Sequence, residues 1–144
     1  MIQADTTRIL ESLRADRQCT GAFASLRVDG ARLVCQAKGA EAEYALEALE
    51  TGWRISLSTA DRWLSESIES QLVESRESLE ELLEEELKDL DCNDPAPKMR
   101  HFRNEAKRFV FECTFADSAR ARTYFLAFES MFRQLGDMSE SGGH

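Results

Sequence analysis

The segment AFASLRVDGARLVCQAK, residues 22–38, constrains the fold more than any other part of the chain. Its first half alternates with a period of two, which is typical of a strand with one buried side. One side consists of Phe23, Ser25 and Arg27 and the other of Ala24, Leu26 and Val28. Asp29 and Gly30 follow, and this pair favours a tight type I′ turn, in which both central residues have positive φ. The segment therefore predicts an antiparallel hairpin.

Three further segments have strand character. The stretch WRISLS places Trp53, Ile55 and Leu57 on one side of a strand. The stretch KMRHFRNEAKRFVFECTF, residues 98–115, predicts a second hairpin, whose aromatic side belongs against a core. Residues 40–50 are ambiguous, because Ala and Glu favour helix. We expect an irregular or short helical connection there, with an extra strand over residues 43–49 as the alternative.

Apolar residues at spacings of three and four predict the helices. Residues 3–17 form the first, and a leucine-rich stripe between Leu64 and Leu90 forms a long helical region. Ser78 and Glu81 have the spacing of a capping box, so this region is either one helix or two. Two prolines at 95 and 97 end it. A last helix follows Asp117, with an aromatic stripe that ends near Leu135.

These elements follow the order α-β-β-β-α-β-β-α, with strands segregated from helices. Such an order is typical of a two-layer α+β fold, in which helices pack on an antiparallel sheet. We expect one domain over residues 1–136, a common size for a single domain, and a flexible tail over 137–144.

Negative charge is concentrated in one stretch of the sequence. Between Asp61 and Asp91 there are twelve acidic and three basic residues, a net charge of −9 that equals the net charge of the whole chain. An acidic chain is poorly suited to nucleic acid or to anionic membranes. We expect a basic or amphipathic segment of another protein as the partner. No apolar run resembles a signal peptide or a membrane span, which predicts a cytoplasmic protein.

The glutamates of SLEELLEEELKDLDC, residues 78–92, are the candidate docking surface. Glu86 falls within the arc of the leucine stripe, so its carboxylate needs a partner, and the basic second hairpin is the expected source. We therefore expect the partner-binding residues to be Glu80, Glu81, Glu84, Glu85, Glu86, Arg100 and Arg103. Two alternatives stay open: a solvated helix face with internal ion pairs, and the interface of a homodimer.

Catalytic and metal-binding patterns are largely missing from the sequence. Asp89, Asp91 and Asn93 resemble the start of a calcium-binding loop, but Asp94 stands where that loop needs glycine and Arg100 where it needs glutamate. Four cysteines and His101 are the only support for a competing hypothesis, a small-molecule-binding or thiol-dependent enzyme. We expect no catalytic residues, metal or cofactor.

The order of elements resembles that of type III secretion chaperones and YbjN-like proteins. The residues that carry the resemblance are AFASLRVDGARLVCQAK, WRISLS, the Leu64–Leu90 helical region, RFVFECTF and the closing TYFLAFESMF. The resemblance implies a non-enzymatic module, dimeric and chaperone-like or adaptor-like, that binds a segment of another protein on its sheet or helix surface. It does not imply service to a secretion system.

Overall fold

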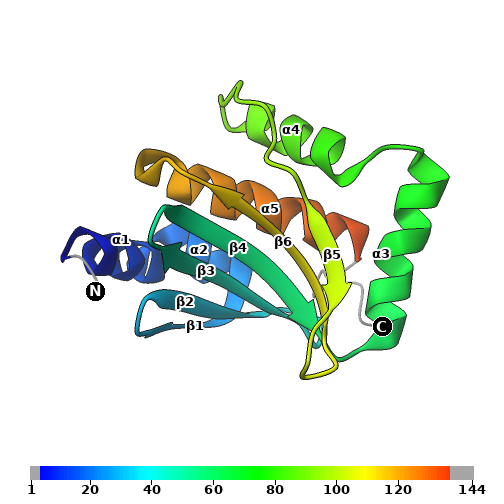
Figure 1. Cartoon of the computed structure of the whole chain (residues 1–144), viewed down its shortest axis with the longest axis horizontal. Helices are drawn as coiled ribbons and strands as arrows, with labels where there is room; N and C mark the ends of the chain where they lie inside the picture. The colour runs from blue at the N-terminus through cyan, green and yellow to red at the C-terminus, as the bar shows by residue number, and fades with distance from the viewer. Residues whose placement is uncertain (1–3, 137–144) are drawn as a thin grey trace.

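A six-stranded antiparallel sheet with helices on one face forms the fold, as seen in a computed structural model that describes residues 4–136 (Figure 1). The strands are β1 (Phe23–Asp29), β2 (Arg32–Ala37), β3 (Glu43–Leu49), β4 (Gly52–Thr59), β5 (Arg100–Arg103) and β6 (Phe109–Phe115). The helices are α1 (Ala4–Ala15), α2 (Arg17–Ala22), α3 (Arg62–Ser75), α4 (Leu79–Asp89) and α5 (Ala121–Leu135), with a 3-10 turn, η1 (Ser118–Arg120). In the sheet the strands follow the order β1-β2-β3-β4-β6-β5, and this confirms the predicted α+β class.

The core lies between the sheet and α5. In Figure 1, α2 and α5 lie behind the strands, and α1 packs beside them against β1 and β2. Alternate residues of β4 are buried, as their spacing predicts, and they face the aromatic side of α5. The ring centroids of Phe111 and Phe132 lie 5.1 Å apart, and those of Phe23 and Phe125 lie 5.4 Å apart. These contacts join both halves of the sheet to one helix.

The first hairpin forms where it is predicted, with two local differences. Its turn is shifted by one residue: Asp29 pairs with Arg32, so Gly30 and Ala31 are the central residues. Only Gly30 has a positive φ, of 60°, which fits a type II′ turn. A bulge between Phe23 and Ser25 shifts the register, so Phe23 joins the buried side rather than that of Ser25 and Arg27.

Residues 43–49 form strand β3, so the expectation of an irregular or helical connection is wrong and the alternative is confirmed. β3 pairs with β2 on one side and β4 on the other. Tyr44 and Leu46 are buried against the helices, whereas Glu43 and Glu47 extend from the opposite face. Burial between two strands outweighs the helix preference of Ala and Glu.

Capping residues divide each of two predicted helical regions into two helices. The first ends at Ala15, because the Asp16 carboxylate accepts hydrogen bonds from the amides of Gln18 and Cys19 and starts α2. The leucine-rich region is two helices, as the capping box allows: Ser78 and Glu81 cap each other's backbone at the start of α4. Arg76, with a φ of 61°, ends α3 in the left-handed region.

Two of the sequence predictions concern the ends of the chain. The predicted tail over 137–144 and the first residue of the predicted N-terminal helix, Gln3, lie outside the described residues. Within residues 4–136, no helix combines the length and the apolar character that crossing a bilayer requires.

Asp16 is expected to stabilise the fold through two helices at once. It caps α2, and its carboxylate lies 2.7 Å from Nε of Arg122 on α5. Replacing Asp16 by Ala should lower the free energy of unfolding by about 1–2 kcal/mol in urea titration. Asp5→Ala is the matched control, because Asp5 is largely exposed and 4.0 Å from Arg8. Equal effects of the two substitutions would contradict this role.

The Asp16 effect should also depend on pH. The hydrogen bond from Arg122 holds the pKa of Asp16 below its ordinary value of 3.8. A depressed folded-state pKa adds stability above the unfolded-state pKa, and that stability is lost as the pH falls through the folded-state pKa. The difference between the wild type and Asp16→Ala should therefore shrink at pH 3 relative to pH 6.

Candidate functional site: a groove along α5

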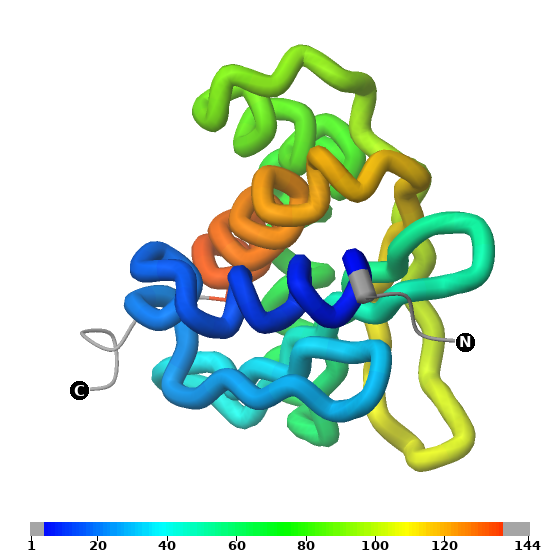
Figure 2. Tube along the Cα trace, turned by 90° about the vertical axis from the view of Figure 1, so that its left-hand side faces the viewer, coloured from blue at the N-terminus to red at the C-terminus, as the bar shows by residue number. Residues whose placement is uncertain are grey.

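A groove of about 740 Å³ lies between α2, α4 and α5. In Figure 2, α5 runs between α4 above and α2 below. We call this hollow the α5 groove; its lining includes Lys38, Glu86, Asp89, Leu90, Leu126, Glu129 and Arg133. Three helices that are distant in sequence thus meet around a surface that carries both apolar and charged groups.

Glu129 is the buried acid of the groove. Glu129 is only 4% exposed. Its carboxylate accepts a hydrogen bond of 2.9 Å from Nε of Arg133, one turn later in α5. Burial raises the pKa of Glu129 above its ordinary value of 4.5; Arg133 and Lys38 counter this effect, and Glu86 adds to it. The groove therefore holds a carboxylate whose charge is only partly compensated.

Glu86 lies at the rim of the groove, and its partner differs from the predicted one. Its carboxylate accepts a hydrogen bond of 3.1 Å from Nε2 of Gln134 on α5, not from a cation of the second hairpin. The helical spacing correctly predicts that Glu86 faces the protein. The element that it contacts there is α5, not the second hairpin. Glu86 and Gln134 also line a second hollow of about 180 Å³, so their hydrogen bond lies where the two hollows meet.

Other glutamates of α4 have partners within the chain. Glu80 Oε2 accepts a hydrogen bond of 2.8 Å from the amide of Met99, and Glu84 Oε2 accepts one of 3.2 Å from the amide of Ala96. These bonds fasten residues 90–99, the connection from α4 to β5, to the acidic side of the helix. Glu81 belongs to the capping box, while Glu85 is exposed. Much of the predicted docking surface is therefore used to hold this connection.

Arg100 and Arg103 have partners other than those glutamates. Arg100 Nη1 is 3.0 Å from Glu112 Oε2 on the adjacent strand, and its guanidinium lies 5.0 Å from the ring centroid of Phe102. Arg103 lies over the ring of Phe109 at 5.5 Å and lines a separate hollow beside Arg62. Of the seven predicted partner-binding residues, only Glu86 lines the α5 groove, and the prediction for the others stays a prediction.

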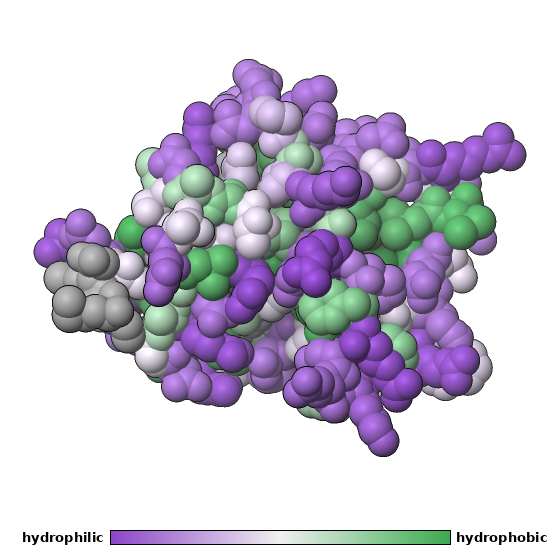
Figure 3. Space-filling view, in the orientation of Figure 1, coloured by the Kyte–Doolittle hydropathy of each residue, from purple (hydrophilic) through white to green (hydrophobic). Residues whose placement is uncertain are grey.

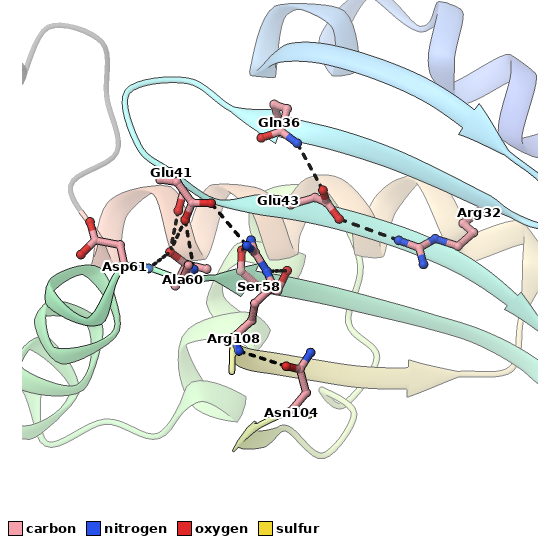
Figure 4. A network of polar contacts seen from close by, with 10 residues as sticks. Arg32, Gln36, Glu41, Glu43, Ser58, Ala60, Asp61, Asn104 and Arg108 are labelled. Carbon is pink, nitrogen blue, oxygen red and sulfur yellow. Dashed lines mark hydrogen bonds and ion pairs between the residues drawn. The ribbon is translucent and has the colours of Figure 1, made fainter. Parts of the chain in front are cut away.

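The sheet face opposite α5 is open and polar. Figure 3 shows this face as largely hydrophilic, with small apolar areas between charged side chains. The ion pairs on it include Arg54–Glu47 at 2.6 Å and Arg32–Glu43 at 3.8 Å. Arg32 and Glu43 are not opposite each other in the register, so the Arg32 side chain runs along the sheet (Figure 4). Acids on this face are matched by bases of neighbouring strands.

A polar cluster closes one end of the open face. Arg108 donates to the Ser58 carbonyl at 3.0 Å and lies 3.4 Å from Glu41 Oε1 (Figure 4). Burial raises the pKa of Glu41, but hydrogen bonds from the Ala60 amide, Thr59 and Arg108 outweigh it, so the pKa lies below the ordinary value. These contacts tie the loop before β3 to the end of β4 and start of β6. These polar groups are hydrogen-bonded to one another, which suits a structural role.

Burial disfavours the thiolate form of three of the four cysteines. All four cysteines are free and buried. Burial raises the pKa of Cys19 to about 11 and that of Cys113 to about 12, and it raises the pKa of Cys35 as well. A nucleophilic cysteine needs a depressed pKa.

His101 lies between an aromatic ring and a carboxylate, because its Nε2 is 3.9 Å from Glu69 Oε2. His101 stacks on Phe111 with ring centroids 3.9 Å apart, and its Nδ1 lies 3.0 Å from the Val110 carbonyl oxygen. In the part of the chain that the structure describes, no three His, Cys, Asp or Glu side chains converge as metal ligands.

Comparisons with protein-family models, curated protein sequences and solved structures find no match for this chain. The resemblance to type III secretion chaperones and YbjN-like proteins therefore stays a prediction from the order of elements.

Removing the Glu80 carboxylate should loosen the connection between α4 and β5. In Glu80→Ala the amide of Met99 loses its hydrogen-bond acceptor. If the free energy of local opening falls by about 1.4 kcal/mol, hydrogen exchange at this amide should become about tenfold faster. Glu85→Ala is the control on the same helix, because Glu85 is exposed. Unchanged exchange at Met99 would show that the hydrogen bond contributes little.

Glu129 should make the stability of the protein fall as the pH rises. An acid whose folded-state pKa lies above its unfolded-state value destabilises the fold once it ionises. Relative to Glu129→Gln, the wild type should therefore lose stability between pH 4 and pH 7, measured by urea unfolding at each pH. Glu85→Gln is the control substitution, because Glu85 is exposed. A relative gain in stability would mean that Arg133 outweighs burial.

Proposed function

We propose that this chain is a non-enzymatic protein-interaction module, chaperone-like or adaptor-like, and that it binds a basic amphipathic segment of a partner protein in the α5 groove. The observation that carries the proposal is that an exposed apolar side chain and two carboxylates lie together in one hollow. Leu90, which is 39% exposed, lies there with the carboxylates of Glu86 and Asp89. An exposed leucine beside acids suits a segment that presents both apolar and cationic side chains.

The shape of the groove supports the same partner. Helices flank it on two sides, and Leu126 of α5 contributes an apolar part to its lining. Amphipathic segments commonly bind by laying their apolar side into a groove between helices, with charges at the rim. The volume of about 740 Å³ leaves room for several side chains.

The net negative charge of the chain supports the proposal, because it acts on a partner before the two proteins are in contact. The chain has a net charge of −9, concentrated in the region that contains α3 and α4. An acidic surface of this kind speeds the approach of a basic segment and disfavours acidic ones. The cytoplasmic location stays a prediction from the sequence.

Two peptides test the proposed chemistry directly. One is an amphipathic helix of Leu and Lys, and the other has every Lys replaced by Glu. The Lys peptide should bind the full chain in fluorescence anisotropy and the Glu peptide should not. Glu86→Lys with Asp89→Lys should weaken binding by about tenfold or more, which corresponds to about 1.4 kcal/mol.

The matched control carries the same charge change outside the groove. Glu74→Lys with Glu85→Lys also moves the net charge from −9 to −5, since each substitution adds two positive charges. Both residues are exposed. If this control weakens binding as much as the groove variant does, the peptide responds to net charge alone and the groove is not the site.

A further inference from the structure

Strand β1 leaves one edge of the sheet open. The sheet ends at β1 on one side and at β5 on the other, and β5 is only four residues long. β1 has seven residues, and its bulge near Phe23 leaves the stretch from Ser25 to Asp29 regular. A free edge offers unpaired backbone groups to another strand, and proteins usually block such edges.

The register identifies the backbone groups that face outward. Asp29 and Arg32 close a two-residue turn, so they form a hydrogen-bonded pair. Such pairs alternate along an antiparallel ladder, which directs Arg27 and Asp29 toward β2 and the backbones of Leu26 and Val28 away from it. Among residues 4–136, no backbone hydrogen bond joins Leu26 or Val28 to a segment outside the sheet.

The charges on β1 also differ from those on the inner strands. Arg27 and Asp29 lie on the open face of the sheet, and both are exposed. Within the described part of the chain neither lies within 4 Å of an opposite charge. The neighbouring strands, by contrast, pair Arg32 with Glu43 and Arg54 with Glu47. The edge strand thus carries one unpaired cation and one unpaired anion, two residues apart.

We infer that β1 pairs antiparallel with β1 of a second copy of this chain, about a two-fold axis through Val28. Val28 then lies opposite Val28 of the second copy, and both present outward-directed backbone groups, as a hydrogen-bonded pair requires. Arg27 lies opposite Asp29 of the second copy, and Asp29 opposite its Arg27. This is a non-hydrogen-bonded position, at which side chains come closest.

Neighbouring registers are less favourable for a second copy. An axis through Leu26 would place Arg27 opposite Ser25, and it would run the pairing into the bulge. An axis through Arg27 would still pair the outward-directed backbones of Leu26 and Val28, but it would place two guanidiniums opposite each other at a non-hydrogen-bonded position. In the register with its axis through Val28, the charges of two identical β1 strands are complementary. This self-complementarity favours a second copy of the chain over a strand of another protein. The pairing would join two six-stranded sheets into one, and it does not use the carboxylates of the α5 groove.

Sedimentation velocity of the full chain across a concentration series tests this pairing. The wild type should form a dimer that weakens at high salt. Arg27→Asp alone and Asp29→Arg alone each place like charges opposite one another twice, so the dissociation constant should rise by about tenfold or more. The double variant, Arg27→Asp with Asp29→Arg, should dimerise within about threefold of the wild type, because its charges are complementary again.

Mixing the two single variants gives the sharpest result. An equimolar mixture should form a heterodimer although neither variant dimerises alone, since each carries the charge that the other needs at both positions. Circular dichroism of each variant checks that it is folded, and Glu86→Lys should leave the dimer unchanged. A monomeric wild type, including one whose β1 pairs only with other proteins, would overturn the inference. So would a dimer that ignores the single charge reversals.

Discussion

Burial of the aromatic side of α5 against one face of the sheet is the interaction on which the rest of the structure depends. Phe125, Phe128 and Phe132 are fully buried, and each contributes about 1.5–3 kcal/mol through burial. Next to this aromatic side of α5 lie the buried Glu129 and, one turn later, Arg133, and both line the groove with α2 and α4. With the helices committed to one face, the opposite face of the sheet has to be polar. The groove and the open sheet face thus follow from one packing arrangement.

The concentration of carboxylates on α4 is tolerated because its costs are small and partly offset. Like charges four residues apart, such as Glu80 and Glu84, cost about 0.2–0.5 kcal/mol per pair. Burial of Leu83 and Leu87 on the same helix contributes several times as much. The carboxylates of Glu80 and Glu84 also accept backbone amides from a connection in which two prolines provide no N–H of their own. Much of the acidic run is therefore structural.

Local patterns predicted the fold well, and contacts between distant segments explain what they missed. The first hairpin and the capping box at Ser78 are local, so their residues specify them. Strand β3 was misjudged because pairing with β2 and β4, rather than its own preference, decides its conformation. The partner of Glu80 is a backbone amide nineteen residues away, and no side-chain pattern marks it. The α5 groove needs three helices brought together, so among the residues that line it only Glu86 was predicted to bind a partner.

The open sheet face and the α5 groove differ in whether their charged side chains already have partners, and this difference decides which of them suits a basic partner. On the open sheet face, carboxylates such as Glu47 and Glu112 already have guanidinium partners within 3.0 Å. A partner binding there would have to replace contacts that exist in the free protein, so little net attraction would remain. Near the groove, Glu86 has only an amide partner, and no ion pair involves Asp89 within residues 4–136. A cation that arrives there gains new contacts, and electrostatics therefore favours the groove over the sheet face for a basic partner.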